Sequence, residues 1–407
     1  MCFILILIAI VVFVSSVIPL MRREAWWIRV FDFPRLQVLL LALIDIGLLL
    51  VVGPASSWPG ALALVAASTA AIIQTAHVFP YTPLAPQEVL DARDSAPEST
   101  LSLLIANVLM DNRATDALLV LAYELRPDII LLLEPNAWWE ERMQPLEAAW
   151  PYQVKRPLEN EYGMLLYSRL LLVEPETKFL LRDGIPSMHT QVQLPSGARV
   201  WLHCLHPEPP SPTEADSSLP RDAELLMVGR EVKARGGPAI VAGDLNDVAW
   251  SYTTRLFQKI CGLLDPRRGR GMFNTFNAKV PLMRWPLDHV FHSEHFLLAD
   301  IRRLPRFGSD HFPVYVRLVL QPGADALQQA PEAQGKDDAV ALDKTSRADD
   351  VGSTTGRESR RGMRSSHRNV LAGASLLSSP VESRRYAFTK DVSGRLGAPS
   401  HERARGQ

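Results

Sequence analysis

The hydrophobic and polar positions divide the chain into a very apolar N-terminal part, a mixed middle part and a polar C-terminal part. Residues 2–20, 36–53 and 60–79 are almost wholly apolar. Each run is about 20 residues long, the length of helix that spans the hydrocarbon core of a bilayer. We therefore predict a membrane region with about three transmembrane helices over residues 1–80. Buried core helices, or a cleaved signal peptide in the first run, are the alternatives.

From Thr100 onward, short apolar strands alternate with helices that carry one apolar face. This alternation is typical of an α/β sandwich, in which helices pack on sheets. We predict a globular domain over residues 99–320, preceded by an extended proline-rich linker over residues 81–98. No periodic apolar face follows Gln321, so residues 321–407 are predicted to be a disordered tail. The predicted strands are 101–108, 128–133, 165–167, 200–205, 239–242 and 314–320.

The distribution of arginines predicts how the chain crosses the membrane. Four arginines lie between the first two apolar runs, at positions 22, 23, 29 and 35, whereas the turn after the second run has no Lys or Arg. Basic loops favour the cytoplasmic side of a membrane. We therefore predict a multi-pass protein of the cell (inner) membrane whose globular domain is cytoplasmic, with an extracytoplasmic domain as the alternative.

Composition excludes several classes of protein. The chain is 47% hydrophobic and its formal net charge is −1, so it is neither a basic coat for nucleic acid nor an acidic disordered chain. Its three cysteines, Cys2, Cys204 and Cys261, are far apart and form no disulfide framework or zinc-knuckle spacing.

Polar side chains collect where the apolar strands of the globular domain end. Strand ends on one edge of a sandwich converge on a shared cleft. Asp244 and Asn246 are two residues apart, so an extended backbone would point both side chains to the same face. The candidate site residues are Asn107, Glu134, His206, Asp244, Asn246, Asp288, Asp310 and His311.

Oxygen ligands dominate this set, and no thiol belongs to it. Carboxylate and amide oxygens suit Mg²⁺ or Mn²⁺ better than zinc. Several carboxylates in one cleft would repel one another unless a cation neutralised them. A divalent metal with histidine and amide donors fits the hydrolysis of a phosphate ester.

Each candidate also has a purely structural interpretation. Asp244 can cap the helix that follows it, and Glu134 can be a solvated strand end. We expect His203 to be structural, and we expect His189, His292 and His295 to lie on the surface.

Several short motifs, taken in chain order, resemble those of the endonuclease/exonuclease/phosphatase superfamily, whose fold is the deoxyribonuclease-I-like fold. The resemblance covers roughly residues 100–320. Its motifs are Ile105-Ala106-Asn107, Pro127-Asp128-Ile129-Ile130 through Glu134, Gly163 through Ser168-Arg169, His206, Gly243-Asp244-Leu245-Asn246, Leu287-Asp288-His289 and Gly308 to Pro313.

The resemblance implies a four-layer α/β sandwich of two facing mixed sheets flanked by helices. It implies that Glu134 holds Mg²⁺, with Asn107 and Asp310 nearby. It also implies roles for the other candidates. Asp244 would orient or deprotonate the attacking water. Asn246 would bind the phosphate, and His206 would bind it or assist the leaving group. His311, oriented by Asp288, would be the general base or a phosphate-binding imidazolium.

The resemblance leaves the substrate open. Members of the superfamily cut DNA, RNA or phospholipids, so a nucleic acid, a phospholipid and another small phosphodiester all stay possible substrates. A membrane-anchored binding or scaffold protein that keeps the fold without turnover is the alternative from a different class. The lipid bilayer is the one partner that the apolar runs imply.

Overall fold

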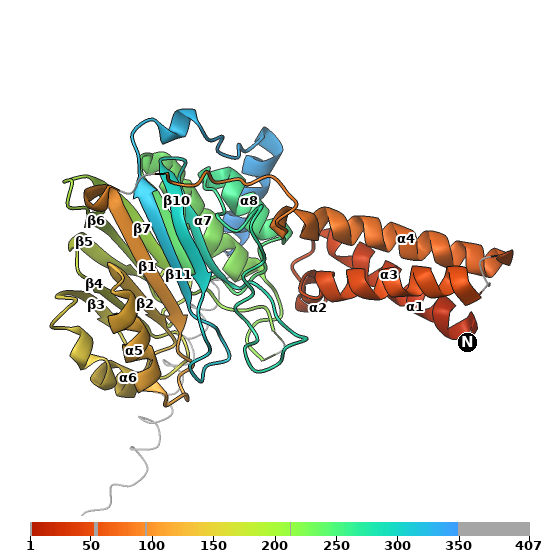
Figure 1. Ribbon diagram of the computed structural model, residues 1–407, viewed down its shortest axis with the longest axis horizontal. Helices are drawn as coiled ribbons and strands as arrows, with labels where there is room; N and C mark the ends of the chain where they lie inside the picture. Colours follow the sequence, from red (N-terminus) through yellow and green to blue (C-terminus); the bar gives the residue numbers. More distant parts are fainter. Residues whose placement is uncertain (1, 53–55, 94–95, 212, 349–407) are drawn as a thin grey trace, which may run out of the picture. The chain divides into compact units, whose positions relative to one another are not determined.

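The computed structural model describes residues 2–52, 56–93, 96–211 and 213–348. Its N-terminal part consists of three long helices, α1 (Cys2–Val17), α3 (Arg35–Val52) and α4 (Trp58–Val78), which pack on one another (Figure 1). With the short turns that extend two of them, all three are long and apolar enough to cross a membrane. The segment between α1 and α3 contains a short helix, α2 (Trp26–Arg29).

The first sheet of the globular domain has six strands and is mixed. Strand β1 (Thr100–Asn107) pairs antiparallel with β11 (Val314–Leu320) and parallel with β2 (Ile129–Leu133). The order across the sheet is β10 (Phe296–Arg303), β11, β1, β2, β4 (Met164–Ser168) and β3 (Tyr152–Arg156).

The second sheet has five strands and is also mixed. Strands β7 (Arg199–Leu205) and β8 (Ala239–Asp244) are parallel, and the other neighbours are antiparallel. The order is β5 (Leu171–Lys178), β6 (Ser187–Gln193), β7, β8 and β9 (Asp288–His292).

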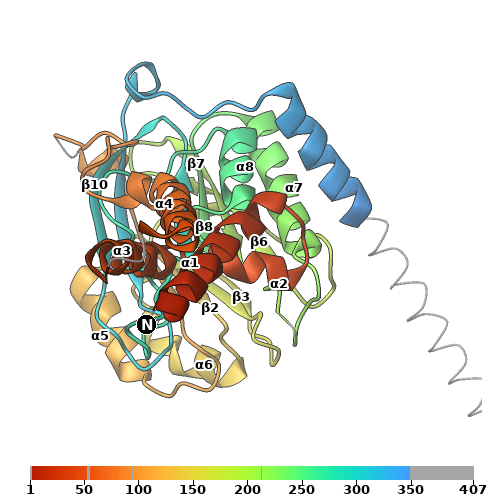
Figure 2. The ribbon, with the colours of Figure 1, turned by 90° about the vertical axis from the view of Figure 1, so that its right-hand side faces the viewer.

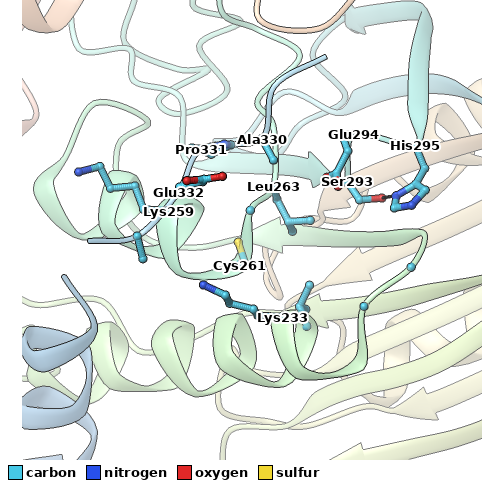
Figure 3. A pocket seen from close by; sticks show the side chains of 15 residues that line it. Lys233, Lys259, Cys261, Leu263, Ser293, Glu294, His295, Ala330, Pro331 and Glu332 are labelled. Carbon is cyan, nitrogen blue, oxygen red and sulfur yellow. Dashed lines mark hydrogen bonds between the residues drawn. The ribbon is translucent and has the colours of Figure 1, made fainter. Parts of the chain in front are cut away.

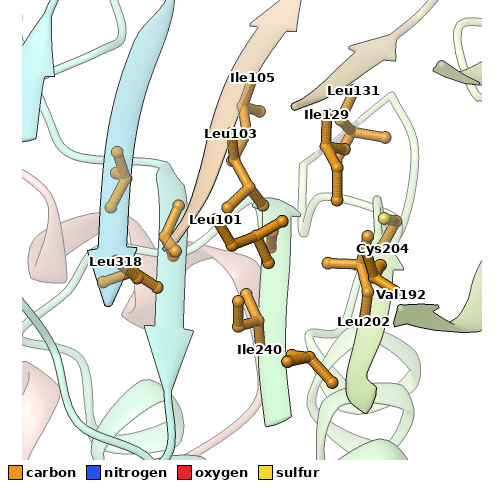
Figure 4. Close-up of a cluster of buried hydrophobic side chains, with 14 of the residues drawn as sticks. Leu101, Leu103, Ile105, Ile129, Leu131, Val192, Leu202, Cys204, Ile240 and Leu318 are labelled. Atoms are coloured by element: carbon orange, nitrogen blue, oxygen red, sulfur yellow. The ribbon is translucent and has the colours of Figure 1, made fainter. Parts of the chain in front are cut away.

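Alternating side chains of β1 show how the two sheets form layers. Leu101, Leu103 and Ile105 join the core between the sheets, where they meet residues such as Leu202 of β7 (Figure 4). Leu104, on the opposite face, packs under the helices on the outer side of the first sheet. This period of two is what an extended strand imposes on its side chains.

Helices cover both outer faces of the sandwich. The helices α5 (Thr115–Leu125) and α6 (Ala137–Arg142) contribute to the cluster on the first sheet, and α7 (Leu219–Arg235) and α8 (Tyr252–Cys261) to the cluster on the second. The domain is therefore a four-layer α/β sandwich, and the predicted fold class is confirmed (Figure 1).

The segment predicted as a linker packs against the domain. Val89 is fully buried and belongs to the core between the sheets. Arg268 Nη1 lies 2.7 Å from Glu88 Oε1, and Arg270 Nη2 lies 2.6 Å from Asp91 Oδ1. The proline pattern indicated an extended segment but carried no information about these arginines, which lie far along the chain.

Part of the predicted tail is ordered as well. Residues 335–348 form a helix that lies beside α7 (Figure 2), where Lys344 Nζ contacts Asp222 Oδ2 at 2.9 Å. The prediction of disorder is therefore wrong for this stretch, whose buried Ala341 and Lys344 face the domain. The rest of the predicted tail, residues 349–407, lies outside the described residues.

Candidate active site

The ends of β1, β2 and β8 bring three predicted site residues into contact. Asn107 Nδ2 donates to Glu134 Oε1 at 2.6 Å and to Asp244 Oδ2 at 3.2 Å. Asn107 belongs to the first sheet and Asp244 to the second, so this amide bridges the sandwich. Strand ends at one edge meet in space, as the sequence predicted.

His311 lies between two carboxylates of the second sheet. Its Nδ1 is 2.7 Å from Asp288 Oδ2, and its Nε2 is 3.5 Å from Asp244 Oδ2. Burial lowers the pKa of His311, but the two carboxylates more than offset this effect and raise the pKa to about 10. At neutral pH, the side chain is therefore an imidazolium.

Asp244 is a fully buried carboxylate that stays ionised. Burial raises its pKa, but the His311 and His206 imidazoles and the hydrogen bond from Asn246 N–H together hold the pKa below its usual value. The side chain can therefore accept a hydrogen bond, or a proton, from a water molecule beside it.

His206 lies on the other side of the site. Its ring pairs Nδ1 with the backbone oxygen of Asp244 at 3.2 Å, which turns Nε2 toward Glu134 Oε1 at 3.7 Å. The Tyr162 ring lies against it, with 5.6 Å between the ring centroids. The ring is therefore held so that its Nε2 faces the carboxylate of Glu134.

The backbone at Glu134 is unusual and depends on a glycine. Glu134 has φ 62°, a left-handed conformation that non-glycine residues rarely adopt. Its N–H donates to the Gly163 oxygen at 2.9 Å, and a Cβ at Gly163 would collide with the Pro135 oxygen. Backbone outliers of this kind cluster at functional sites because the surrounding structure must hold them in place.

Asn246 is close to the site, but for a different reason than the one predicted. Its φ is 50°, so the backbone after β8 is left-handed and not extended. Its N–H donates to Asp244 Oδ1 at 2.9 Å, and its Nδ2 donates to the Pro207 oxygen at 2.9 Å. The side chain amide therefore joins the loop after β8 to the loop that carries His206.

Asp310 lies at the edge of the site and is half-buried. Among the described residues, its carboxylate has one hydrogen bond, from Ser309 Oγ at 3.4 Å. The structure does not bring it into contact with Glu134 or Asn107, so its place beside a metal stays a prediction. Its negative charge helps to raise the pKa of His311.

The donor set fits a divalent cation. Burial raises the pKa of Glu134 to about 7, even though His206 and Asn107 favour its ionised form. Asp288 Oδ1 is buried and accepts no hydrogen bond from any residue that the structure describes. Ionisation of Glu134 is costly in this environment, and Mg²⁺ or Mn²⁺ would neutralise the carboxylate.

A different ligand set, Asp244, Asp288 and His311, places its donor atoms within 4.8 Å of one another. We favour Glu134 as the metal ligand because both ring nitrogens of His311 already face carboxylates. A protonated imidazole has no free lone pair for a metal.

Two residues at the site carry no signal in the sequence motifs. Thr275 Oγ1 accepts hydrogen bonds from Leu287 N–H at 3.2 Å and Asp288 N–H at 3.1 Å, which fixes the start of β9. The Phe276 ring lies 5.0 Å from the His311 ring. Both belong to an irregular segment before β9, where no periodicity marks a function.

Two of the histidines predicted to lie on the surface are buried. His189 and His292 are 2% and 0% exposed. His189 Nδ1 pairs with His203 Nδ1 at 2.7 Å, and burial lowers the pKa of both rings, which therefore stay neutral. The alternation of side chains along the strand predicted that His203 is structural, but it gave no indication that His189 is its partner.

A separate hollow in the described surface lies away from these residues. It has a volume of about 350 Å³ and is lined by Lys233, Lys259, Cys261, His295 and Glu332, among others (Figure 3). None of the candidate site residues contributes to it. Burial raises the pKa of the Cys261 thiol, so this cysteine is not an activated nucleophile.

The fold and the site define a class of protein: an α/β sandwich with carboxylates, an amide and histidines gathered where the strands of its two sheets end. A model of the Endonuclease/Exonuclease/phosphatase family matches residues 104–311, about half of the chain. The chain therefore belongs to this family, whose members are commonly metal-dependent phosphodiesterases or nucleases.

Solved structures resemble the chain at low sequence identity. Humanized D. rerio TDP2 is 17% identical, with a TM-score of 0.47, covering 54% of this chain and 99% of its own. An endonuclease/exonuclease/phosphatase from Beutenbergia cavernae is 18% identical, with a TM-score of 0.45, covering 55% and 72%. The human Nocturnin catalytic domain is 16% identical, with a TM-score of 0.45, covering 58% and 98%. No curated protein matches the chain.

Proposed function

We propose that the chain is a membrane-tethered, Mg²⁺-dependent phosphoesterase that hydrolyses a phosphodiester by attack of an activated water. One observation carries the proposal: Asn107 bridges Glu134 and Asp244, while His311 bridges Asp244 and Asp288. These contacts join the carboxylate that would bind a metal to the imidazolium of His311. Hydrolysis of a phosphate ester uses both a metal and positively charged hydrogen-bond donors to stabilise the phosphate oxygens.

Glu134 would hold the cation, with Asn107 and Asp310 beside it. When bound, the divalent metal would neutralise phosphate oxygens and favour ionisation of a water molecule. The remaining roles belong to side chains of this protein. Asp244 orients the attacking water and accepts its proton, because it is ionised and faces the space beside Glu134.

His311 binds a phosphate oxygen as an imidazolium, since its raised pKa keeps it charged. The positive charge of the ring favours the phosphate-binding role over the role of a general base, which requires a neutral ring. Asp288 fixes the ring through Nδ1 and leaves Nε2 directed toward Asp244. The Asn246 amide provides a further hydrogen-bond donor for phosphate oxygens. His206 Nδ1 is held by the Asp244 oxygen, so Nε2 faces the same space and is placed to exchange a proton with the leaving group.

The proposal is tested with purified full-length protein in detergent and the soluble substrate bis(p-nitrophenyl) phosphate. We expect hydrolysis with Mg²⁺ or Mn²⁺, none after chelation, and recovery when the metal is returned. His311→Ala and Glu134→Gln should each abolish turnover, whereas His295→Ala, a histidine outside the site, should not. Metal-independent turnover, or near-full rate in either site variant, would contradict the proposal.

The globular domain is proposed to lie in the cytoplasm, on the same side as the loop between the first two spans. Two observations support a shared side: Trp26 N–H donates to the Asp216 oxygen at 3.1 Å, and Tyr81 OH donates to the Ala249 oxygen at 2.8 Å. A reporter fused after Gln407 tests the compartment. Activity of a periplasm-specific reporter would overturn the cytoplasmic placement.

A further inference from the structure

An exposed apolar loop lies between α8 and β9. Residues 279–283 are consecutive exposed positions, and four of the five are apolar or proline. Leu282 is 83% exposed, Met283 52% and Val280 41%. Water-exposed side chains of this size, side by side at the tip of one loop, mark a surface that contacts another molecule.

The tip of this loop is bonded to a membrane-spanning helix. Gln37 Nε2, in the first turn of α3, donates to the Leu282 oxygen at 2.9 Å. Below the tip, Trp285 packs edge-on against Phe33, which precedes α3, with 5.6 Å between the ring centroids. The apolar tip therefore lies at the level where α3 begins, which is the bilayer interface if α3 spans the membrane.

The base of the same loop forms one wall of the candidate active site. Thr275 holds the N–H groups of Leu287 and Asp288, and its carbonyl oxygen accepts from Phe312 N–H at 2.9 Å. Phe276 contacts the His311 ring. One short segment thus connects the start of a spanning helix to the imidazolium.

Basic side chains lie between the apolar tip of the loop and its base at the candidate active site. Arg284 and Arg303 stack on the Phe312 ring, at 5.0 and 4.4 Å from its centroid. Lys279 is exposed beside the apolar tip. Apolar residues flanked by cations are typical of surfaces that contact a bilayer with anionic head groups.

We propose that residues 279–284 dip into the bilayer interface and that the site acts on a phosphodiester carried by a membrane lipid. The inference rests on the proposed phosphoesterase function and names its substrate class. The bilayer is the occupant that the structure favours, because the loop is continuous with a spanning helix through Gln37. Trp27 and Val30, in the segment before α3, are also exposed, at 51% and 48%, as apolar residues at a bilayer interface would be.

A depth measurement tests the contact without relying on activity. Cys2 is the exposed cysteine among the three native ones, so Leu282→Cys in a Cys2→Ala background gives one labelling site. The full-length protein carries a fluorophore there in nanodiscs of phosphatidylcholine and phosphatidylglycerol. Nitroxide groups on the lipid chains should quench it strongly.

The matched control is Leu171→Cys, an exposed leucine of edge strand β5 (Figure 1), where quenching should be weak. Equal quenching at the two positions, or none at Leu282, would overturn the contact. A second copy of the chain covering the loop would instead quench only when a nitroxide-labelled copy is present.

The substrate class is tested with Leu282→Asn/Met283→Asn in the same nanodiscs. Hydrolysis of phosphatidylglycerol should fall about tenfold, the change expected when large apolar contacts with a bilayer are removed. Hydrolysis of soluble bis(p-nitrophenyl) phosphate should be unchanged, because neither residue touches the site.

The two kinds of failure are distinguishable. If the native protein cleaves the soluble diester but no phosphatidylglycerol or phosphatidylcholine, the lipid inference is overturned and the phosphoesterase function stands. If the double variant keeps its full rate on lipid, the contribution of the loop to lipid hydrolysis is overturned, while the lipid substrate and the phosphoesterase function stand. If the native protein cleaves neither substrate, the proposed function and its lipid substrate both fail, and the quenching experiment still decides the bilayer contact.

Discussion

Replacing Asp288 with asparagine should disable the site without changing its shape. The carboxylate lies 2.7 Å from His311 Nδ1, closer than Asp244, which is 3.5 Å from Nε2. Asparagine has the same size but no charge, so burial would dominate and the pKa of His311 would fall. Loss of one donor that stabilises charge in the transition state typically lowers kcat by about 10²–10³, and we expect a loss of kcat in that range.

The same substitution should change how stability depends on pH. His311 has a pKa of about 10 in the folded protein, against 6.5 for the free side chain. This difference corresponds to roughly 5 kcal/mol of stabilisation as an upper limit. Because the folded pKa is the higher one, the contribution is complete below pH 6.5 and is lost as the pH rises toward about 10. The free energy of unfolding of the native protein should therefore decline across this window, and that of Asp288→Asn should decline less.

Thermal unfolding of the metal-free full-length protein in detergent, measured from about pH 6 to about pH 10, checks this expectation. The matched control is Asp300→Asn, which removes a partly exposed carboxylate 2.8 Å from Arg302 and outside the site. Such surface pairs contribute about 1 kcal/mol or less, so the control should follow the native curve. Parallel curves for the native protein and Asp288→Asn, or retained turnover in the variant, would refute the reasoning.

Three further substitutions test individual contacts. Glu134→Gln should abolish metal-dependent turnover yet raise the melting temperature of the metal-free protein above pH 7, because burial raises the pKa of this carboxyl to about 7 and its ionised form opposes folding. Gly163→Ala should destabilise by about 1–3 kcal/mol in a urea titration, since the new Cβ would collide with the Pro135 oxygen. Arg29→Met should cost about 3–5 kcal/mol, because it leaves the buried Asp247 carboxylate with one cation fewer.

Matched controls separate these effects from general damage. A Cβ at Gly335 would meet no atom within 4 Å, so Gly335→Ala should leave stability unchanged. Arg347→Met removes a guanidinium that is 46% exposed and paired with Glu24, and should cost less than about 1 kcal/mol. Equal losses in a control and its partner variant would argue against a specific role for the contact.

The strands and the site residues at their ends could be predicted because both follow from local patterns. Apolar runs such as 129–133 are buried on both faces, and a run of that kind reads as a strand without knowledge of its neighbours. The polar residue that ends each run then falls at the sheet edge. Asn107, Asp244 and His311 meet for this reason, although no two of them are close in sequence.

The sequence could not predict features that depend on partners far along the chain. Arg267 is buried, and its Nη2 lies 2.6 Å from Nδ1 of His289, which belongs to β9. The left-handed backbone of Asn246 occurs together with a hydrogen bond from its Nδ2 to the oxygen of Pro207, in the loop after β7. The sequence on either side of these two residues gives no indication of the distant partner.

Contacts join the N-terminal helical region and the globular domain in one compact unit. Arg29 Nη2 lies 3.4 Å from Asp247 Oδ2, and Trp250 Nε1 donates to the Asp32 oxygen at 2.7 Å. Burial raises the pKa of Asp247 in spite of Arg29 and a second guanidinium, Arg221, so loss of either cation leaves a costly charge. The Asp247 oxygen also pairs with His289 Nε2 at 2.8 Å, beside Asp288 at the start of β9. The loop that follows the site residues of β8 is therefore held in place by the segment between α1 and α3, so the N-terminal region supports the geometry of the site.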